Sequence, residues 1–320
     1  MRQINLFIVL TILCFSCKRE DQFKSQIAAI EMEVAIERCD LAFANASAKD
    51  LPKLKETFPF MFSKKFKDSF WIAQMRDTLQ IELNQAVNEV FPDLNVVELE
   101  IEEFFRHLQF YFSEFKKTRI VSATSFVDYR NKVIVTDTIT LIAIDTYFGA
   151  DHPFYDGIQK YLRANFNSDQ IVVDMASEYA KDYIYPIQQK TLLDEMIFFG
   201  KQLYFKDLMI PFKSDAEKIG YSEEQLQWSQ ANEAQIWKFM VERELLFSTD
   251  SKLPNRFINP APFSKFYLEE IDRESPGRIG QFIGWQIVRS YMENNEVSLK
   301  KMLTIDAKEL FNNSRYKPAL

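Results

Sequence analysis

The sequence predicts an α+β protein that is mainly α-helical, with a helical N-terminal part and one small antiparallel sheet. Two observations lead to this prediction. Before residue 118 and after residue 150, long segments place apolar side chains at the spacing of an amphipathic helix. Between them, a single stretch over residues 119–147 is rich in Val, Ile and Thr, which favour strands.

Helices are expected over most of the chain. Phe91-Pro92 should end one of them, because proline cannot continue a helix. Ser222 and Gln225 form a capping-box pattern at the start of another. The stretch 247–275, which contains three prolines, is expected to be irregular. The helical segments predicted by spacing are 24–48, 71–90, 97–117, 155–166, 169–183, 191–206, 222–246, 277–293 and 305–312.

The strand-rich stretch is expected to form a hairpin. Residues 119–127 and 133–147 would be its two strands, and 128–131 its turn. Residues 141–144 are apolar on both faces, which predicts a strand covered by helices on each side.

Composition excludes several classes of function. Lys and Arg number 39 against 46 Asp and Glu, a net charge of −7, so no nucleic-acid partner is expected. The two histidines, His107 and His152, lie too far apart in the sequence for an H-E-x-x-H zinc helix. Seven glycines form neither a G-x-G-x-x-G nor a Walker loop. No cofactor and no metal are therefore expected.

The N-terminus has the pattern of a lipoprotein signal peptide. A cationic start precedes an uncharged run over residues 4–16, which is shorter than the roughly 20 residues of a membrane-spanning helix. Ser16 directly precedes Cys17, which we expect to be the lipidated residue; Cys14 is the alternative, but Leu13 before it is bulky. The expected organisation is a signal peptide over 1–16, a lipidated tether over 17–23 and a single domain over 24–320.

One predicted helix has the outline of a zinc-peptidase helix. Asp194 occupies the first ligand position, Glu195 the general-base position and Phe198 the second ligand position, and Glu233 follows at the distance of a third ligand. Phe198 has no lone pair, so a working site would keep only Asp194 and Glu233 as ligands. The alternative is that Asp194 and Glu195 are acidic first-turn residues that favour the helix dipole.

The densest glycine cluster lies in residues 276–288. Gly280 and Gly284 are four residues apart and should lie on one helix face, where another backbone can approach closely. A peptide-binding groove lined by this face is the alternative. Arg278 could pair with a buried carboxylate such as Glu195 or Glu233, or lie on the surface. Cys39 is expected to be a small buried apolar residue.

The chain resembles the gliding-motility lipoprotein GldB family of the Bacteroidota. The resemblance covers nearly the whole chain and rests on Cys17, on residues 141–149 and 230–237, and on the segments Leu-Leu-Asp-Glu-Met-Ile-Phe-Phe-Gly-Lys (192–201) and Pro-Gly-Arg-Ile-Gly-Gln-Phe-Ile-Gly-Trp-Gln-Ile-Val (276–288). It implies a membrane-anchored envelope protein required for gliding, a process associated with type IX secretion, with no established catalytic activity.

The chain is also distantly similar to predicted zinc peptidases, which implies a zincin-like core that has lost its ligand histidines. The first hypothesis is therefore a pseudo-enzyme, anchored in the inner or outer membrane by acyl chains, that binds protein partners of the gliding or secretion machinery. The second is an envelope hydrolase with a metal and Glu195 as general base. The third is a carrier that holds apolar cargo on a surface rich in phenylalanine.

Overall fold

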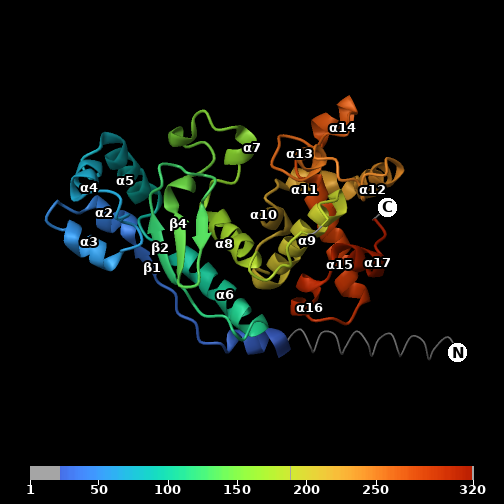
Figure 1. Ribbon diagram of the computed structural model, residues 1–320, viewed down its shortest axis with the longest axis horizontal. Helices are drawn as coiled ribbons and strands as arrows, with labels where there is room; N and C mark the ends of the chain where they lie inside the picture. Colours follow the sequence, from blue (N-terminus) through green and yellow to red (C-terminus); the bar gives the residue numbers. More distant parts are fainter. Residues whose placement is uncertain (1–21, 188, 319–320) are drawn as a thin grey trace.

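The computed structural model describes residues 22–187 and 189–318. It is an α+β protein in which a small mixed sheet stands between two groups of helices (Figure 1). The mainly helical α+β class predicted from the sequence is confirmed. A core that is specifically zincin-like is not established by this arrangement.

The sheet has the strand order β1-β2-β4-β3. β1 (Ile36–Arg38), β2 (Arg119–Ala123) and β4 (Ile139–Ala143) are parallel, and only β3 (Val133–Val135) runs antiparallel, beside β4. The antiparallel sheet predicted from the sequence is therefore wrong. The predicted hairpin is wrong as well, because the actual hairpin joins β3 to β4.

A buried carboxylate holds the turn that follows β2. Asp145 follows β4 and accepts hydrogen bonds from the Ser125 and Val127 amides and from the Ser125 hydroxyl. The turn that it holds places Phe126 and Val127 at positive φ. The carboxylate thus satisfies backbone amides of this turn.

Helices cover both faces of the sheet, as the apolar run at 141–144 predicted. Val121 and Leu141 face a cluster formed with the N-terminal helices, whereas Ile120 and Ile142 face the main core. α6 (Asn95–Tyr111) and α8 (Ile171–Ala180) lie on that main-core side, to which α5 (Thr78–Val90) adds Leu83 and Val87. The helices α2 to α4, within residues 39–74, lie on the other side (Figure 1). Alternate side chains of one strand thus join two different clusters.

The N-terminal helices are shorter than predicted. The expected helix over 24–48 is interrupted by an extended segment and β1, and the helix over 71–90 is broken at 75–77, where Asp77 caps the next helix by accepting from the Gln80 amide. The observed helices are α2 (Cys39–Ala44), α3 (Leu51–Thr57), α4 (Asp68–Gln74), α5 (Thr78–Val90) and α6 (Asn95–Tyr111).

The C-terminal half follows the predicted pattern more closely. The segment 155–166 is one error, because only the four residues of α7 form an α-helix there. The stretch 247–275, expected to be irregular, is another, because it contains two short helices, Leu253–Phe257 and Glu269–Glu274. Asn232 splits 222–246 into two helices, although the capping box at Ser222 is confirmed. The helices are α7 (Lys160–Arg163), α8 (Ile171–Ala180), α9 (Leu192–Met209), α10 (Asp215–Ile219), α11 (Glu223–Ala231), α12 (Glu233–Glu242), α13 (Leu253–Phe257), α14 (Glu269–Glu274), α15 (Ile279–Asn294), α16 (Leu299–Thr304) and α17 (Ala307–Ser314).

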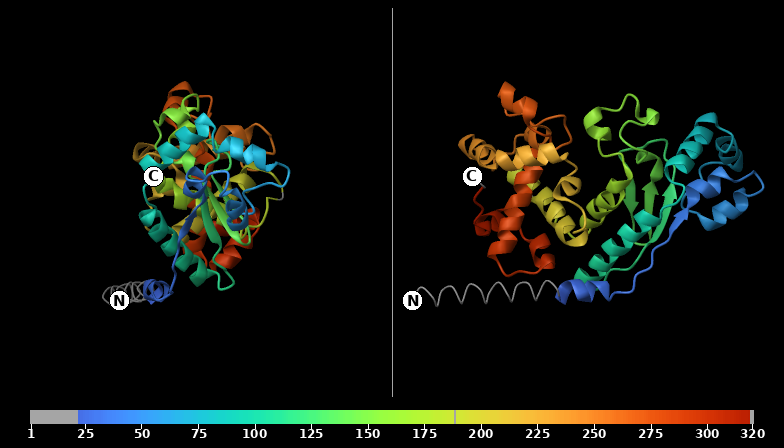
Figure 2. Two further views of the ribbon diagram at one scale, coloured as in Figure 1. Left: turned by 90° about the vertical axis from the view of Figure 1, so that its left-hand side faces the viewer. Right: turned by 180° about the vertical axis from the view of Figure 1, so that it is seen from behind.

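α9 and α15 cross at very short range and form the centre of this half (Figure 2). A Cβ atom added to Gly284 would overlap the Met196 carbonyl, and one added to Gly200 would overlap the carbonyl of Gly284 and lie 2.8 Å from the Trp285 amide nitrogen. The close backbone approach predicted for this glycine face is confirmed. The crossing fixes α15, and hence the loop before it, against α9.

The proposed signal peptide and Cys17 lie outside the described residues. Within 22–187 and 189–318, no helix is both long and apolar enough to cross a membrane. Cys39 is 4% exposed, as predicted, and burial raises the pKa of its thiol to about 12. This thiol is therefore protonated and unreactive at neutral pH.

Candidate functional site

The residues that resembled a zinc site have local structural roles. Asp194 is the third residue of α9, and its carboxylate accepts from the Thr191 amide at 2.9 Å and from the Thr191 hydroxyl, while the Thr191 hydroxyl accepts from the Asp194 amide. This reciprocal capping box satisfies donors at the start of the helix. Asp194 is therefore a helix-capping residue in this structure.

Glu195 and Phe198 follow Asp194 on the same helix, and Phe198 lines a small cavity together with Asp194. Glu195 is partly exposed, and burial followed by the nearby Asp194 charge raises its pKa. Phe198 lies one turn further along and contacts the edge of the Phe199 ring. Its side chain also lines a larger cavity.

Glu233 is the first residue of α12, and its carboxylate is hydrogen-bonded to a tyrosine. Its Oε1 accepts a 2.6 Å hydrogen bond from the Tyr316 hydroxyl, and the same tyrosine packs edge-on against Trp237. Burial, and then the Glu233 carboxylate, raise the pKa of Tyr316. The pair ties the C-terminal segment to α12.

These residues do not fit a zinc ion. A zinc site needs three or four converging donors, whereas Asp194 and Glu233 are bonded to neighbouring hydroxyls and Phe198 offers none. Among the residues that the structure describes, no group of three or more His, Cys, Asp or Glu side chains could hold a metal ion.

Arg278 is the one candidate residue that reaches a large cavity with a charged group. It lies just before α15 with φ at +63°, and its Nη2 donates a 2.7 Å hydrogen bond to the Gly220 carbonyl. Its guanidinium also lies over the Tyr221 ring, whose hydroxyl donates to the Gly277 carbonyl at 2.6 Å. The proposed pairing with Glu195 or Glu233 is not found in the described structure.

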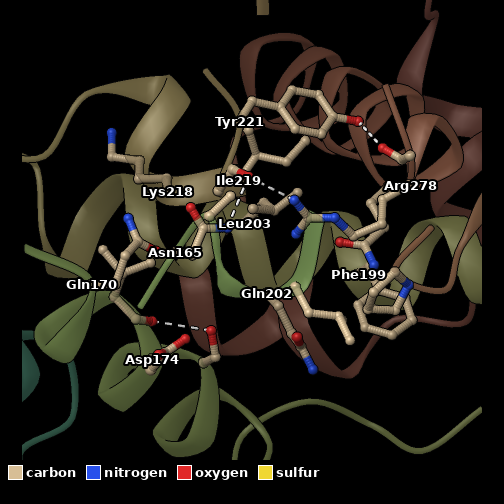
Figure 3. Close-up of a pocket in the computed structure, with 18 of the residues that line it drawn as sticks. Asn165, Gln170, Asp174, Phe199, Gln202, Leu203, Lys218, Ile219, Tyr221 and Arg278 are labelled. Atoms are coloured by element: carbon tan, nitrogen blue, oxygen red, sulfur yellow. Dashed lines mark hydrogen bonds between the residues drawn. The ribbon is translucent and has the colours of Figure 1, made fainter. Parts of the chain in front are cut away.

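The cavity beside Arg278, here called the basic pocket, has a volume of about 540 Å³. Its walls come from α7, α8, α9, the end of α10, the loop 258–262 and the start of α15. Figure 3 shows Arg278 extending toward its centre, with Asn165, Gln202 and Tyr221 around it. The charged residues that line it are Lys132, Asp174, Glu178, Lys181, Lys206, Lys218 and Arg278.

With every lysine protonated, the lining carries a formal net charge of +3, although the whole chain carries −7. Lys206, from α9, is buried, and its Nζ donates to the Lys218 carbonyl at 2.8 Å. Burial lowers the pKa of Lys206 to about 7. The pocket therefore concentrates positive charge in a protein that is otherwise acidic.

Sequence reasoning missed most of this pocket. Lys206 was not singled out, although a lysine among apolar residues of a helix is a signal that could have drawn attention to it. No local sequence pattern marked Asn165 or Tyr221 as pocket residues. Only the folded chain brings the segments after α7 and α10 to the start of α15. Of the five candidate residues, Phe198 and Arg278 line the basic pocket.

A second cavity, of about 230 Å³, lies among the N-terminal helices. Aromatic rings dominate it: Phe66 stacks on Phe70 at 4.3 Å, and both contact Trp71 edge-on. Phe66 is 47% exposed. This is where the structure places part of the phenylalanine-rich surface that the sequence suggested.

Fold and site together define a helix-rich α+β protein with an open, positively charged pocket. The chain belongs to the family described as gliding motility protein GldB, whose family model matches residues 20–318. Membership implies a role in gliding motility, and the family is not a known catalytic one. It is a lipoprotein family, which indicates a membrane-anchored envelope protein. No curated protein and no solved structure matches the chain.

Proposed function

We propose that this protein is a non-catalytic binding component of the gliding or type IX secretion apparatus, anchored in the membrane through acyl chains on Cys17. The basic pocket is the observation that carries the proposal. It is large enough for a small molecule or the end of a partner chain, and its walls include aromatic rings and cations. The pseudo-peptidase interpretation is supported by the structural roles of Asp194 and Glu233.

A pocket-blocking variant tests the binding role. Ala164 is exposed at the pocket lining, so Ala164→Trp should fill part of the entrance without changing charge. Ala28→Trp is the matched control, because Ala28 is also exposed and lies outside this lining. In a deletion strain complemented with each form, we expect Ala164→Trp to abolish gliding and Ala28→Trp to preserve it. Normal gliding with Ala164→Trp, at equal protein level, would remove the pocket from the function.

Two further variants test the absence of catalysis and the anchor. Glu195→Gln keeps the shape of the side chain and removes its basicity, so it should leave gliding unchanged; lost gliding would instead favour the hydrolase with Glu195 as base. Cys17→Ala should release the protein from the membrane and stop gliding, whereas Cys14→Ala should do neither. Normal gliding by an exported, stable Cys17→Ala form would refute the anchoring role.

A further inference from the structure

Two cations of the basic pocket lie beside the same short turn. Lys206 donates to the Lys218 carbonyl, and Arg278 donates to the carbonyl of Gly220, two residues further along. Asn165 reaches the same Gly220 carbonyl through its Nδ2 at 3.0 Å. The carbonyls at the end of α10 therefore hold three donor groups close together.

Most of the hydrogen-bonding capacity of these groups is unused. An arginine carries five N–H donors and a lysine three, yet each makes one hydrogen bond among the described residues. Gln202 projects into the same pocket in Figure 3 and is 7% exposed, and its amide has no hydrogen-bond partner within the described ranges. The pocket thus offers several donors to an incoming ligand.

The neighbouring charges are already balanced. Asp174, on α8, pairs with Lys132 and accepts from the Tyr147 hydroxyl at 3.0 Å. Lys218 pairs with Asp207 at 3.2 Å and with Asp215. Within the part of the chain that the structure describes, no carboxylate lies within 4.0 Å of Lys206 or Arg278. Lys206 is buried and Arg278 is half-buried, and neither has a direct ion-pair partner, so an anionic ligand would supply one and would favour the protonated form of Lys206.

We propose that the basic pocket binds a phosphoryl group through Arg278 and Lys206, with Asn165 and Gln202 as neutral donors. A phosphate monoester carries nearly two negative charges and three terminal oxygens, which matches two cations and two amides. A carboxylate would balance only one of the cations. Tyr129, Tyr161 and Phe166 line the same cavity and would contact the body that carries the phosphate. This inference rests on the proposed function, because it names the ligand class of that pocket.

The direct test uses the full chain in detergent and phenyl phosphate as probe, followed by calorimetry. We expect phenyl phosphate to bind at least tenfold more tightly than benzoate, which has the same ring and a single negative charge. No detectable binding of phenyl phosphate, or equal binding of benzoate, overturns the proposal. This comparison needs only the unmodified chain, so it holds even if a variant fails to fold.

Variants then locate the site. Lys206→Met and Arg278→Gln should each weaken phenyl phosphate binding at least tenfold. Lys201→Met is the matched control, since Lys201 is also a buried lysine of α9 that donates to backbone carbonyls, but it does not line this pocket. It should change binding less than twofold. If Lys201→Met, folded to the same degree, weakens binding as much as Lys206→Met, the assignment is wrong.

Competition identifies the source of the phosphoryl group. Displacement of phenyl phosphate by phosphatidylcholine vesicles that contain phosphatidic acid, but not by pure phosphatidylcholine vesicles, supports a lipid headgroup. Displacement by inorganic phosphate alone supports a soluble phosphate. If phenyl phosphate does not bind but Ala164→Trp still abolishes gliding, the phosphoryl proposal fails while the pocket keeps its binding role.

Discussion

Replacing Gly284 by alanine should destabilise the protein through a direct clash of two helix backbones. The added Cβ would lie 3.1 Å from the Met196 Cα and would overlap the carbonyl of that residue. Neither atom belongs to a side chain that can rotate away, so α9 and α15 must separate by roughly 1 Å to relieve the overlap. The separation would loosen contacts along the crossing, which packs the central pair of helices.

Two opposing contributions set the change in unfolding free energy for Gly284→Ala. Overpacking typically costs about 1–3 kcal/mol, and a backbone clash belongs at the upper end of that range or above it. Alanine gains about 1 kcal/mol over glycine in a helix interior. The expected net loss is about 2 kcal/mol of unfolding free energy. With an unfolding entropy of about 0.6 kcal/mol per kelvin for a chain of this size, the melting temperature should fall by about 3 °C.

Gly280→Ala is the matched control, one turn earlier on the same helix. Its Cβ would lie 2.9 Å from Ile258 Cδ1, the flexible end of a side chain, and 3.0 Å from the Phe257 carbonyl oxygen. The gain in helix propensity should roughly offset this milder crowding, so its melting temperature should stay within about 1 °C of wild type. Differential scanning calorimetry measures both variants. Equal melting temperatures for Gly280→Ala and Gly284→Ala would refute the clash argument.

Three further predictions concern charged groups. Because the pKa of Lys206 is lowered to about 7, the native state loses this proton near neutral pH, while the unfolded state keeps it. The unfolding free energy should therefore rise between pH 7 and 9, by roughly 2–3 kcal/mol more in the wild type than in Lys206→Met. Denaturant titration at each pH measures the difference. Asp194→Ala removes the capping box with Thr191 and should cost about 1 kcal/mol in the same assay without stopping gliding, whereas lost gliding at normal stability would indicate a functional carboxylate. Arg289→Met breaks the bidentate ion pair with Asp207 and should lower the unfolding free energy by about 2 kcal/mol. Because the Arg289 guanidinium also covers the Trp285 ring, the tryptophan fluorescence spectrum should shift, and an unchanged spectrum would contradict the stacking.

The helix crossing and the pocket can be examined together in one variant. Substituting Gly284 changes the helix crossing that positions α15, whereas substituting Lys206 or Arg278 removes a proposed ligand contact in the pocket. A Gly284→Ala protein that folds but binds phenyl phosphate weakly would show that the crossing sets the position of Arg278. Unchanged binding would show that the loop before α15 holds this residue by itself.

The sequence alone determined the features that depend on short-range spacing. Apolar residues at helical intervals predicted α8, α9 and α15, and Ser222 with Gln225 predicted a capping box, because helix faces and caps are set by residues three or four positions apart. The same rule predicted the close approach at Gly284. The both-sided apolar run in β4 also indicated correctly that helices cover the two faces of the sheet.

Only the tertiary structure decided which distant segments meet. Strand direction was predicted wrongly because the chain forms β3 between β2 and β4, so that β3 pairs antiparallel with β4 and the more distant β2 pairs parallel with it. The pocket was missed for the same reason. Lys206 and Arg278 lie 72 positions apart in the sequence, and they become neighbours only because both donate to carbonyls at the end of α10. Local patterns carry no information on such contacts, because long-range packing creates them.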